Sequence, residues 1–140
     1  MEKFCGEGVF IDGSQNICQG EIPLNEIFLG KDLENKILVL KTGHAKKYGR
    51  DEYYENYPVL TFALAEYLIK KKIKAIALDS PSPDKAPYAL HKKILQADIL
   101  IIENAANLDA LSPYENFEIF AFPLKLYAEA SLIRLVARVK

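Results

Sequence analysis

Short apolar runs alternate with polar segments along this chain and predict its strands. Three of the runs are nearly continuous, as is typical of strands buried on both faces, and a fourth alternates between apolar and polar positions. The first run stops at a turn signal, Asp12-Gly13-Ser14. The six predicted strands cover residues 8–12, 37–40, 73–78, 99–102, 117–122 and 132–139.

Two helices are predicted between the central strands. Leu60, Leu64 and Leu68 recur at four-residue intervals after Pro58, which predicts a helix that opens at Pro58 and buries this stripe. A second helix is expected over residues 87–97, because it starts at a proline, a residue favoured in the first helical turn.

The order of these elements predicts an α/β fold. Strand, helix, strand, helix, strand between residues 37 and 102 indicates parallel βαβ units with right-handed crossovers. The flanking strands are expected to pair antiparallel and to complete a mixed sheet. Two helices are too few to cover both faces of a doubly wound sheet. The 140 residues suit one domain, residues 1–140.

Composition and charge exclude several classes of partner. Half of the residues are apolar and the net charge is −1, so nothing predicts binding to nucleic acid or to an anionic membrane. No apolar run has the length of a membrane span, and the first residues lack a signal-peptide pattern. We therefore expect a cytoplasmic protein in which Cys5 and Cys18 are reduced.

Two residues are candidate metal ligands. His91 falls on the second predicted helix, and Glu103 follows 103 − 91 = 12 residues later, directly after a buried strand. Imidazole and carboxylate are the usual protein ligands of zinc and manganese, and open α/β sheets bind ligands at the carboxyl ends of strands. Periodicity alone favours a helix-surface role for His91. Glu103 could instead pair with a lysine or bond to the turn at residues 104–107.

Three further polar residues follow predicted strands. His44 lies after Thr42-Gly43 on the same side of the sheet, where contact with a substrate and plain solvent exposure are about equally supported. Asp12 and Asp79 both end apolar runs, where aspartate usually caps the next turn. We expect neither aspartate to bind a metal.

Four segments, in order, resemble one protein family. They are KILVLKTGH at 36–44, IKAIALDSPS at 73–82, His91 with the ENAANL segment at 103–108, and FPLKL at 122–126. This succession is similar to the C-terminal part of the cyclase family of metal-dependent hydrolases, which includes bacterial kynurenine formamidases and isatin hydrolases. The likeness covers roughly residues 5–140.

The resemblance implies a fold and an activity. The fold would be a three-layer β/β/α arrangement of the swivelling type. The activity would be arylformamidase-like hydrolysis of a small-molecule amide or cyclic amide through a hydroxide bound to zinc or manganese. His91 and Glu103 would be metal ligands, and His44 and Ser82 would lie near the substrate. The resemblance also implies a homo-oligomer.

One departure leaves two interpretations open. Family members carry a motif of the form His-x-Gly-Thr-His-x-Asp-x-Pro that supplies most metal ligands, and this chain, with two histidines, has no counterpart. Either the chain is N-terminally shortened and its lineage is a metal-dependent amidohydrolase, or the protein is an inactive relative that binds small molecules or assembles as an oligomer. An enzyme is the favoured interpretation for the lineage.

Overall fold

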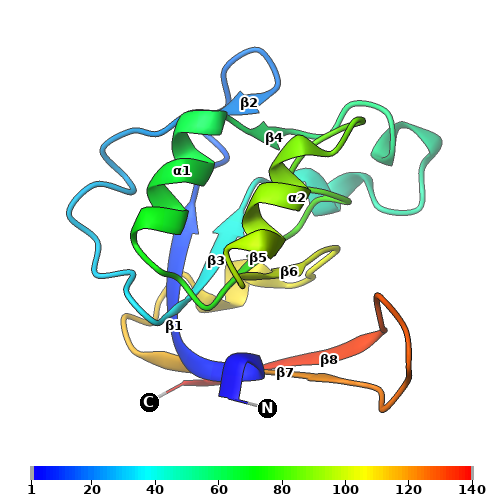
Figure 1. Ribbon diagram of the computed structural model, residues 1–140. Coiled ribbons are helices and arrows are strands. Elements are labelled where there is room, and N and C mark those ends of the chain that lie inside the picture. Colours follow the sequence, from blue (N-terminus) through cyan, green and yellow to red (C-terminus); the bar gives the residue numbers. More distant parts are fainter. Residues whose placement is uncertain (1, 140) are drawn as a thin grey trace.

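The computed structural model describes residues 2–139 and shows an α/β protein built on one curled, mixed sheet (Figure 1). The pairs β6–β5, β5–β3 and β3–β1 are parallel, whereas β7 runs antiparallel to both β1 and β8. The predicted mixed sheet with βαβ units is therefore confirmed. In spatial order the strands are β6 (Leu100–Ile102), β5 (Ala75–Leu78), β3 (Ile37–Lys41), β1 (Cys5–Asp12), β7 (Phe117–Pro123) and β8 (Ile133–Val139).

The remaining elements surround this sheet. The helices α1 (Phe62–Lys70) and α2 (Ala89–Gln96) cover the same face, and β2 (Glu21–Ile22) pairs with β4 (Val59–Leu60) at one end (Figure 1). None of the helices formed by residues 2–139 is long and apolar enough to cross a membrane. The described part of the chain also contains four short 3-10 helices: Glu2–Phe4, His44–Lys47, Asp51–Tyr53 and Leu108–Leu111.

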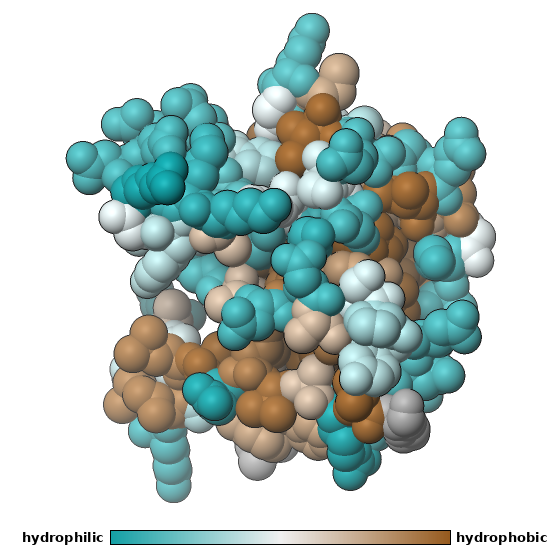
Figure 2. All heavy atoms as spheres, turned by 180° about the vertical axis from the view of Figure 1, so that it is seen from behind, coloured by the Kyte–Doolittle hydropathy of each residue, from teal (hydrophilic) through white to brown (hydrophobic). Residues whose placement is uncertain are grey.

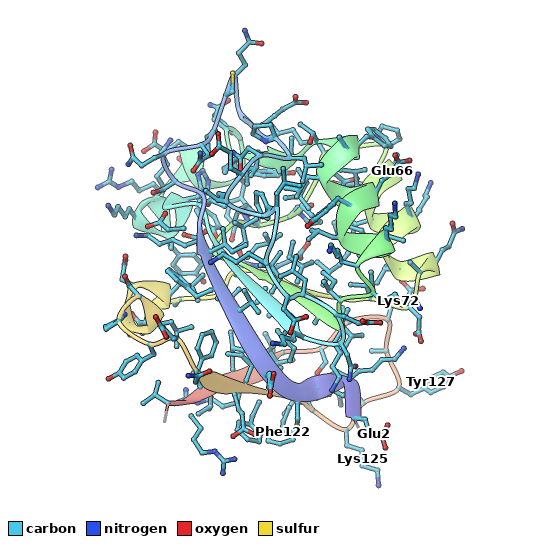
Figure 3. The ribbon with its side chains drawn as sticks, turned by 90° about the vertical axis from the view of Figure 1, so that its left-hand side faces the viewer. Glu2, Glu66, Lys72, Phe122, Lys125 and Tyr127 are labelled. Atoms are coloured by element: carbon cyan, nitrogen blue, oxygen red, sulfur yellow. The ribbon has the colours of Figure 1, made fainter. Side chains whose placement is uncertain are left out.

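Strand β1 bends and so belongs to both halves of the sheet. Its residues 8–12 pair with β3, and its residues 5–7 pair with β7. Figure 3 shows this bend from the side. A Cβ atom built on Gly8 would lie 2.0 Å from the ring of Phe117, so only glycine lets β7 approach this closely. The bend carries the β7–β8 hairpin beneath the parallel strands (Figure 1).

Two hydrophobic cores lie on opposite faces of the parallel strands. Leu38 and Leu40 of β3 face the helices, where Leu64 and Leu68 of α1 pack against them. The alternate residues of β3 face the other core, which holds inward-facing residues of β7 and the last 3-10 helix. All four residues 37–40 are buried, which explains why this strand reads as a continuous apolar run. The buried side chains of the second core are Ile37, Val39, Ala75, Ala77, Ile102, Ala105, Leu108, Leu111, Phe117, Ile119 and Ala121.

The predicted start of the first helix is wrong by four residues. The helix begins at Phe62, not at Pro58, because Val59–Leu60 forms β4 and Thr61 caps the helix. The Thr61 hydroxyl accepts a hydrogen bond from the Leu64 amide at 3.3 Å, as an N-cap residue does. The second helix likewise starts two residues later than predicted, after Tyr88 in a left-handed conformation.

Candidate functional site

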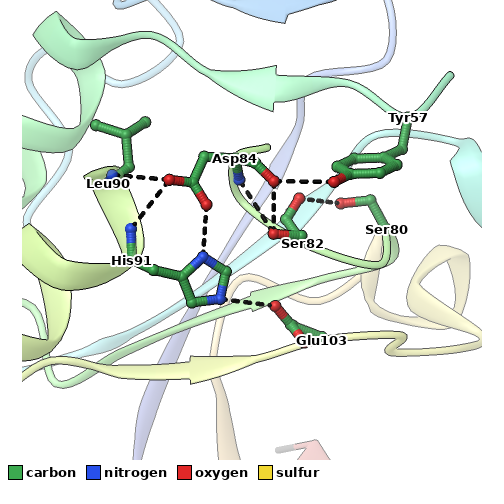
Figure 4. Close-up of polar contacts among 7 residues, drawn as sticks. All are labelled: Tyr57, Ser80, Ser82, Asp84, Leu90, His91 and Glu103. Carbon is green, nitrogen blue, oxygen red and sulfur yellow. Dashed lines mark hydrogen bonds and ion pairs between the residues drawn. The ribbon is translucent and has the colours of Figure 1, made fainter. Parts of the chain in front are cut away.

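The carboxyl ends of three parallel strands bring polar residues to one edge of the sheet. Thr42 and Gly43 follow β3, Asp79 follows β5, and Glu103 follows β6. Parallel strands that end at the same edge commonly place a ligand site there. The loop after β5 and the first turn of α2 lie over this edge (Figure 4).

His91 and Glu103 converge at this edge, as predicted from their positions in the sequence. His91 is the third residue of α2, and its Nε2 lies 3.1 Å from Oε1 of Glu103. Both side chains are partly exposed, His91 by 24% and Glu103 by 32%. Burial raises the pKa of Glu103, and the nearby imidazole opposes part of that rise. Their role as metal ligands stays a prediction.

Asp84 contacts the other nitrogen of the His91 ring and was not among the site residues predicted from the sequence. Its Oδ1 lies 2.5 Å from Nδ1 of His91, while its Oδ2 accepts the amides of Leu90 at 2.7 Å and of His91 at 3.2 Å (Figure 4). One carboxylate therefore caps α2 and orients the imidazole. An aspartate shortly before a predicted helix start is a capping signal that could have pointed to it.

The backbone of Asp84 is fixed by two hydroxyl groups. Ser82 Oγ donates to the Asp84 carbonyl at 2.7 Å and lies 3.3 Å from its amide, and the Tyr57 hydroxyl donates to the same carbonyl at 3.0 Å. Ser80 Oγ in turn donates to the Ser82 carbonyl at 3.3 Å (Figure 4). Ser82 thus supports the Asp84 loop. Its predicted contact with a substrate stays a prediction.

Asp79 joins the ends of β3 and β5. Its carboxylate accepts the Thr42 amide at 2.7 Å, the Thr42 hydroxyl at 2.6 Å and the Gly43 amide at 2.8 Å. These bonds compensate for burying a carboxylate that is 3% exposed. Asp79 therefore bonds across to the neighbouring strand end and does not cap its own turn. Asp12, in contrast, caps the following turn through the Ser14 amide at 3.0 Å, as predicted.

His44 lies buried beside the candidate site. Only 6% of the residue is exposed, so the solvent-exposed alternative is wrong. Its Nε2 lies 2.8 Å from the Tyr53 carbonyl, and the two rings stack with centroids 5.0 Å apart. The Tyr53 hydroxyl donates at 2.7 Å to Oδ1 of Asn104, the residue directly after Glu103. Contact between His44 and a substrate stays a prediction.

Two of the described residues have side chains of the kind that bind metal ions. A metal site in a protein generally uses three or more side-chain ligands. His91 and Glu103 are donors of the right chemical type. Asp84 binds the far ring nitrogen, as carboxylates do behind metal-binding histidines. Across residues 2–139, however, no group of three or more His, Cys, Asp or Glu side chains could hold a metal ion.

Comparison with known proteins identifies the family. Residues 1–85 match the family model described as "Putative cyclase", so the chain belongs to the cyclase family, as its sequence motifs indicate. An uncharacterized protein of Methanocaldococcus jannaschii, MJ0783, is 38% identical over 103 residues, which is 72% of this chain and 53% of that protein.

Solved structures share the fold. Isatin hydrolase A from Ralstonia solanacearum superposes with a TM-score of 0.84 at 21% identity, over 99% of this chain and 62% of the other. A potential metal-dependent hydrolase with cyclase activity superposes with a TM-score of 0.75 at 22% identity, over 95% of this chain and 64% of the other. The chain thus spans about half the length of the curated relative and under two thirds of these structures.

Proposed function

We propose that the protein is a metal-dependent hydrolase of a small-molecule amide or cyclic amide. The observation that carries this proposal is the convergence of His91 Nε2 and Glu103 Oε1, 3.1 Å apart, with Asp84 bonded behind the ring. Family membership and the fold shared with an isatin hydrolase support the same reaction class.

Each residue would have a defined task in that reaction. His91 and Glu103 would bind zinc or manganese, and other ligands would come from another part of the assembled protein. A divalent ion at such a site lowers the pKa of bound water to about 7 and polarises a carbonyl group. His44 and Ser82 would line the substrate side. We further propose a cytoplasmic homo-oligomer with a three-layer β/β/α fold, in which the β7–β8 hairpin belongs to the second β layer.

Metal content tests the proposal directly. Freshly purified protein is expected to contain zinc or manganese by mass spectrometry, and His91→Gln and Glu103→Gln should each reduce that content. Glu66→Gln is the matched control, because Glu66 is a surface carboxylate paired with Lys93. Hydrolysis of N-formylkynurenine and of isatin is the accompanying activity assay. A protein that arrives metal-free and also takes up no added zinc or manganese refutes the proposal for this chain.

A second function is favoured by an exposed apolar surface. The hairpin loop after β7 presents Leu124, Leu126, Tyr127 and Leu132, which are 56% to 110% exposed. Figure 2 shows hydrophobic atoms gathered low on the left over this hairpin, and Figure 3 shows Tyr127 pointing away from the sheet. Exposed apolar patches of this kind mark association sites. An inactive relative that acts as an assembly or small-molecule-binding module would form a metal-free oligomer without hydrolase activity.

A further inference from the structure

Asp84 lies between the start of helix α2 and the His91 ring, and it contacts both. Its Oδ2 is occupied by the two helix amides, at 2.7 and 3.2 Å, so Oδ1 is the oxygen that meets His91 Nδ1 at 2.5 Å. An ionised carboxylate can only accept hydrogen bonds. Glu103 Oε1 faces the other ring nitrogen, Nε2, at the longer distance of 3.1 Å. A neutral imidazole has one proton to donate, and the shorter contact with Asp84 places that proton on Nδ1.

The surroundings hold Asp84 in this position. The residue is 6% exposed, and the Tyr57 and Ser82 hydroxyl groups both bond its carbonyl. Tyr88 also packs edge-on against the His91 ring, with ring centroids 5.6 Å apart. A buried carboxylate with fixed backbone and a packed imidazole together leave the ring one orientation.

We propose that Asp84 is the positioning residue of the site: it sets the tautomer and orientation of His91 so that Nε2, the ring nitrogen beside Glu103, is the unprotonated one. This inference rests on the proposed function, because an unprotonated Nε2 matters most as a metal ligand. The role of Asp84 is nevertheless measurable in the metal-free protein, since the tautomer exists without any metal.

Asp84→Asn is the informative variant because it keeps the shape of the side chain. The helix amides require an acceptor, so the asparagine oxygen will face Leu90 and the asparagine NH₂ will face Nδ1. The NH₂ group can only donate, so Nδ1 becomes an acceptor and the ring proton moves to Nε2. The variant thus reverses the tautomer while it retains the helix cap.

The chain suits a nitrogen NMR measurement because it contains two histidines. His44 Nε2 faces the Tyr53 carbonyl, which can only accept, so His44 should be the Nε2–H tautomer. When both rings are neutral, the wild-type protein should show one Nε2–H ring and one Nδ1–H ring. His91→Gln should remove the Nδ1–H signal and so assign it.

Asp84→Asn should convert the His91 signal to the Nε2–H form and weaken zinc binding by about 10–100-fold, measured by competition with a chromophoric chelator. Tyr57→Phe is the matched control: it removes a hydrogen bond to the same residue but leaves the carboxylate, so the tautomer should stay Nδ1–H. A merely structural role of Asp84 would not reverse the His91 tautomer in Asp84→Asn while leaving it unchanged in Tyr57→Phe.

Two results distinguish a failure of the positioning role of Asp84 from a failure of the proposed metal chemistry. If His91 stays Nδ1–H in Asp84→Asn, or if wild-type His91 is already Nε2–H, the positioning role is overturned whatever the protein does with zinc. If the wild-type protein takes up no metal but the tautomer reverses in Asp84→Asn, the positioning role stands and the proposed metal chemistry fails.

Discussion

Nε2 of His44 lies 2.8 Å from the carbonyl oxygen of Tyr53, and the two rings stack 5.0 Å apart. This pair ties the segment after β3 to the tyrosine-rich loop near the candidate site. The hydroxyl of the same Tyr53 donates to Asn104, so the loop is anchored through both the backbone carbonyl and the side chain of one residue.

Replacing His44 by alanine should therefore destabilise the fold. His44→Ala removes a buried hydrogen bond and a ring contact, and we expect a loss of about 1–3 kcal/mol in the free energy of unfolding, measured by urea denaturation. His44→Gln is the control, because its amide can still donate to the Tyr53 carbonyl and should recover part of the loss. An unchanged unfolding midpoint in His44→Ala would show that the buried ring contributes nothing.

Ionisation of the Tyr53 phenol should make the free energy of unfolding depend on pH in the alkaline range. Burial raises the pKa of its phenol from 10.0 to about 12. Between these values the unfolded state loses the proton first, so the native state binds more protons and stability falls as pH rises. Below pH 10 the contribution is fully present.

The matched variant for this effect is Tyr53→Phe, which has no phenol to ionise. The stability advantage of the wild-type protein over Tyr53→Phe should shrink between pH 10 and 12, because the other tyrosines are common to both proteins. Urea denaturation at a series of pH values measures the difference. A constant difference across this range would mean that Tyr53 ionises as it does in the unfolded chain.

The central strands were predicted well because a strand that is buried on both faces is made of consecutive apolar residues, which the local sequence shows. A strand such as β3, covered on both faces, consists of apolar residues almost without interruption, and such a run can be recognised without long-range information. The start of α1 was mispredicted for the opposite reason. Val59–Leu60 becomes a strand through pairing with Glu21–Ile22, nearly 40 residues away, which periodicity does not report.

The candidate site was predictable only where topology alone determines it. His91 and Glu103 meet because a helix and the following parallel strand return to the same edge of the sheet. Asp84 was missed because its place depends on the loop path, which Ser82 fixes locally and Tyr57 fixes from 27 residues away. The Tyr53–Asn104 bond, across 51 residues, has no local signal at all.

The buried Asp79 should be among the most costly positions to change. Asp79→Asn replaces one accepting oxygen by an NH₂ group that must face a donor, either Gly43 N or the Thr42 groups. We expect a loss of about 2–3 kcal/mol in unfolding free energy by urea denaturation. Thr42→Val removes only the hydroxyl and should cost about 1 kcal/mol. Equal losses in the two variants would contradict this ranking.

The close approach of Gly8 and Phe117 predicts a coupled pair. A Cβ at position 8 would lie 2.0 Å from the Phe117 ring, so Gly8→Ala should cost about 1–3 kcal/mol of stability through overpacking. Adding Phe117→Leu should recover part of this loss, because the smaller side chain can withdraw. Gly6→Ala is the control, since the added Cβ would meet only the flexible end of Lys74, 3.1 Å away. Strict additivity in the double-mutant cycle would refute the steric account.

The exposed end of the β7–β8 hairpin should control self-association. We expect the protein to form an oligomer in sedimentation velocity experiments at micromolar concentration, because β8 is an edge strand and the adjoining loop is apolar. Leu126→Ser combined with Leu132→Ser should shift the protein to a smaller species. Leu29→Ser is the control, since Leu29 is similarly exposed, by 53%, but lies outside the hairpin. A wild-type monomer, or an oligomer that the double variant leaves intact, would show that this hairpin is not the interface.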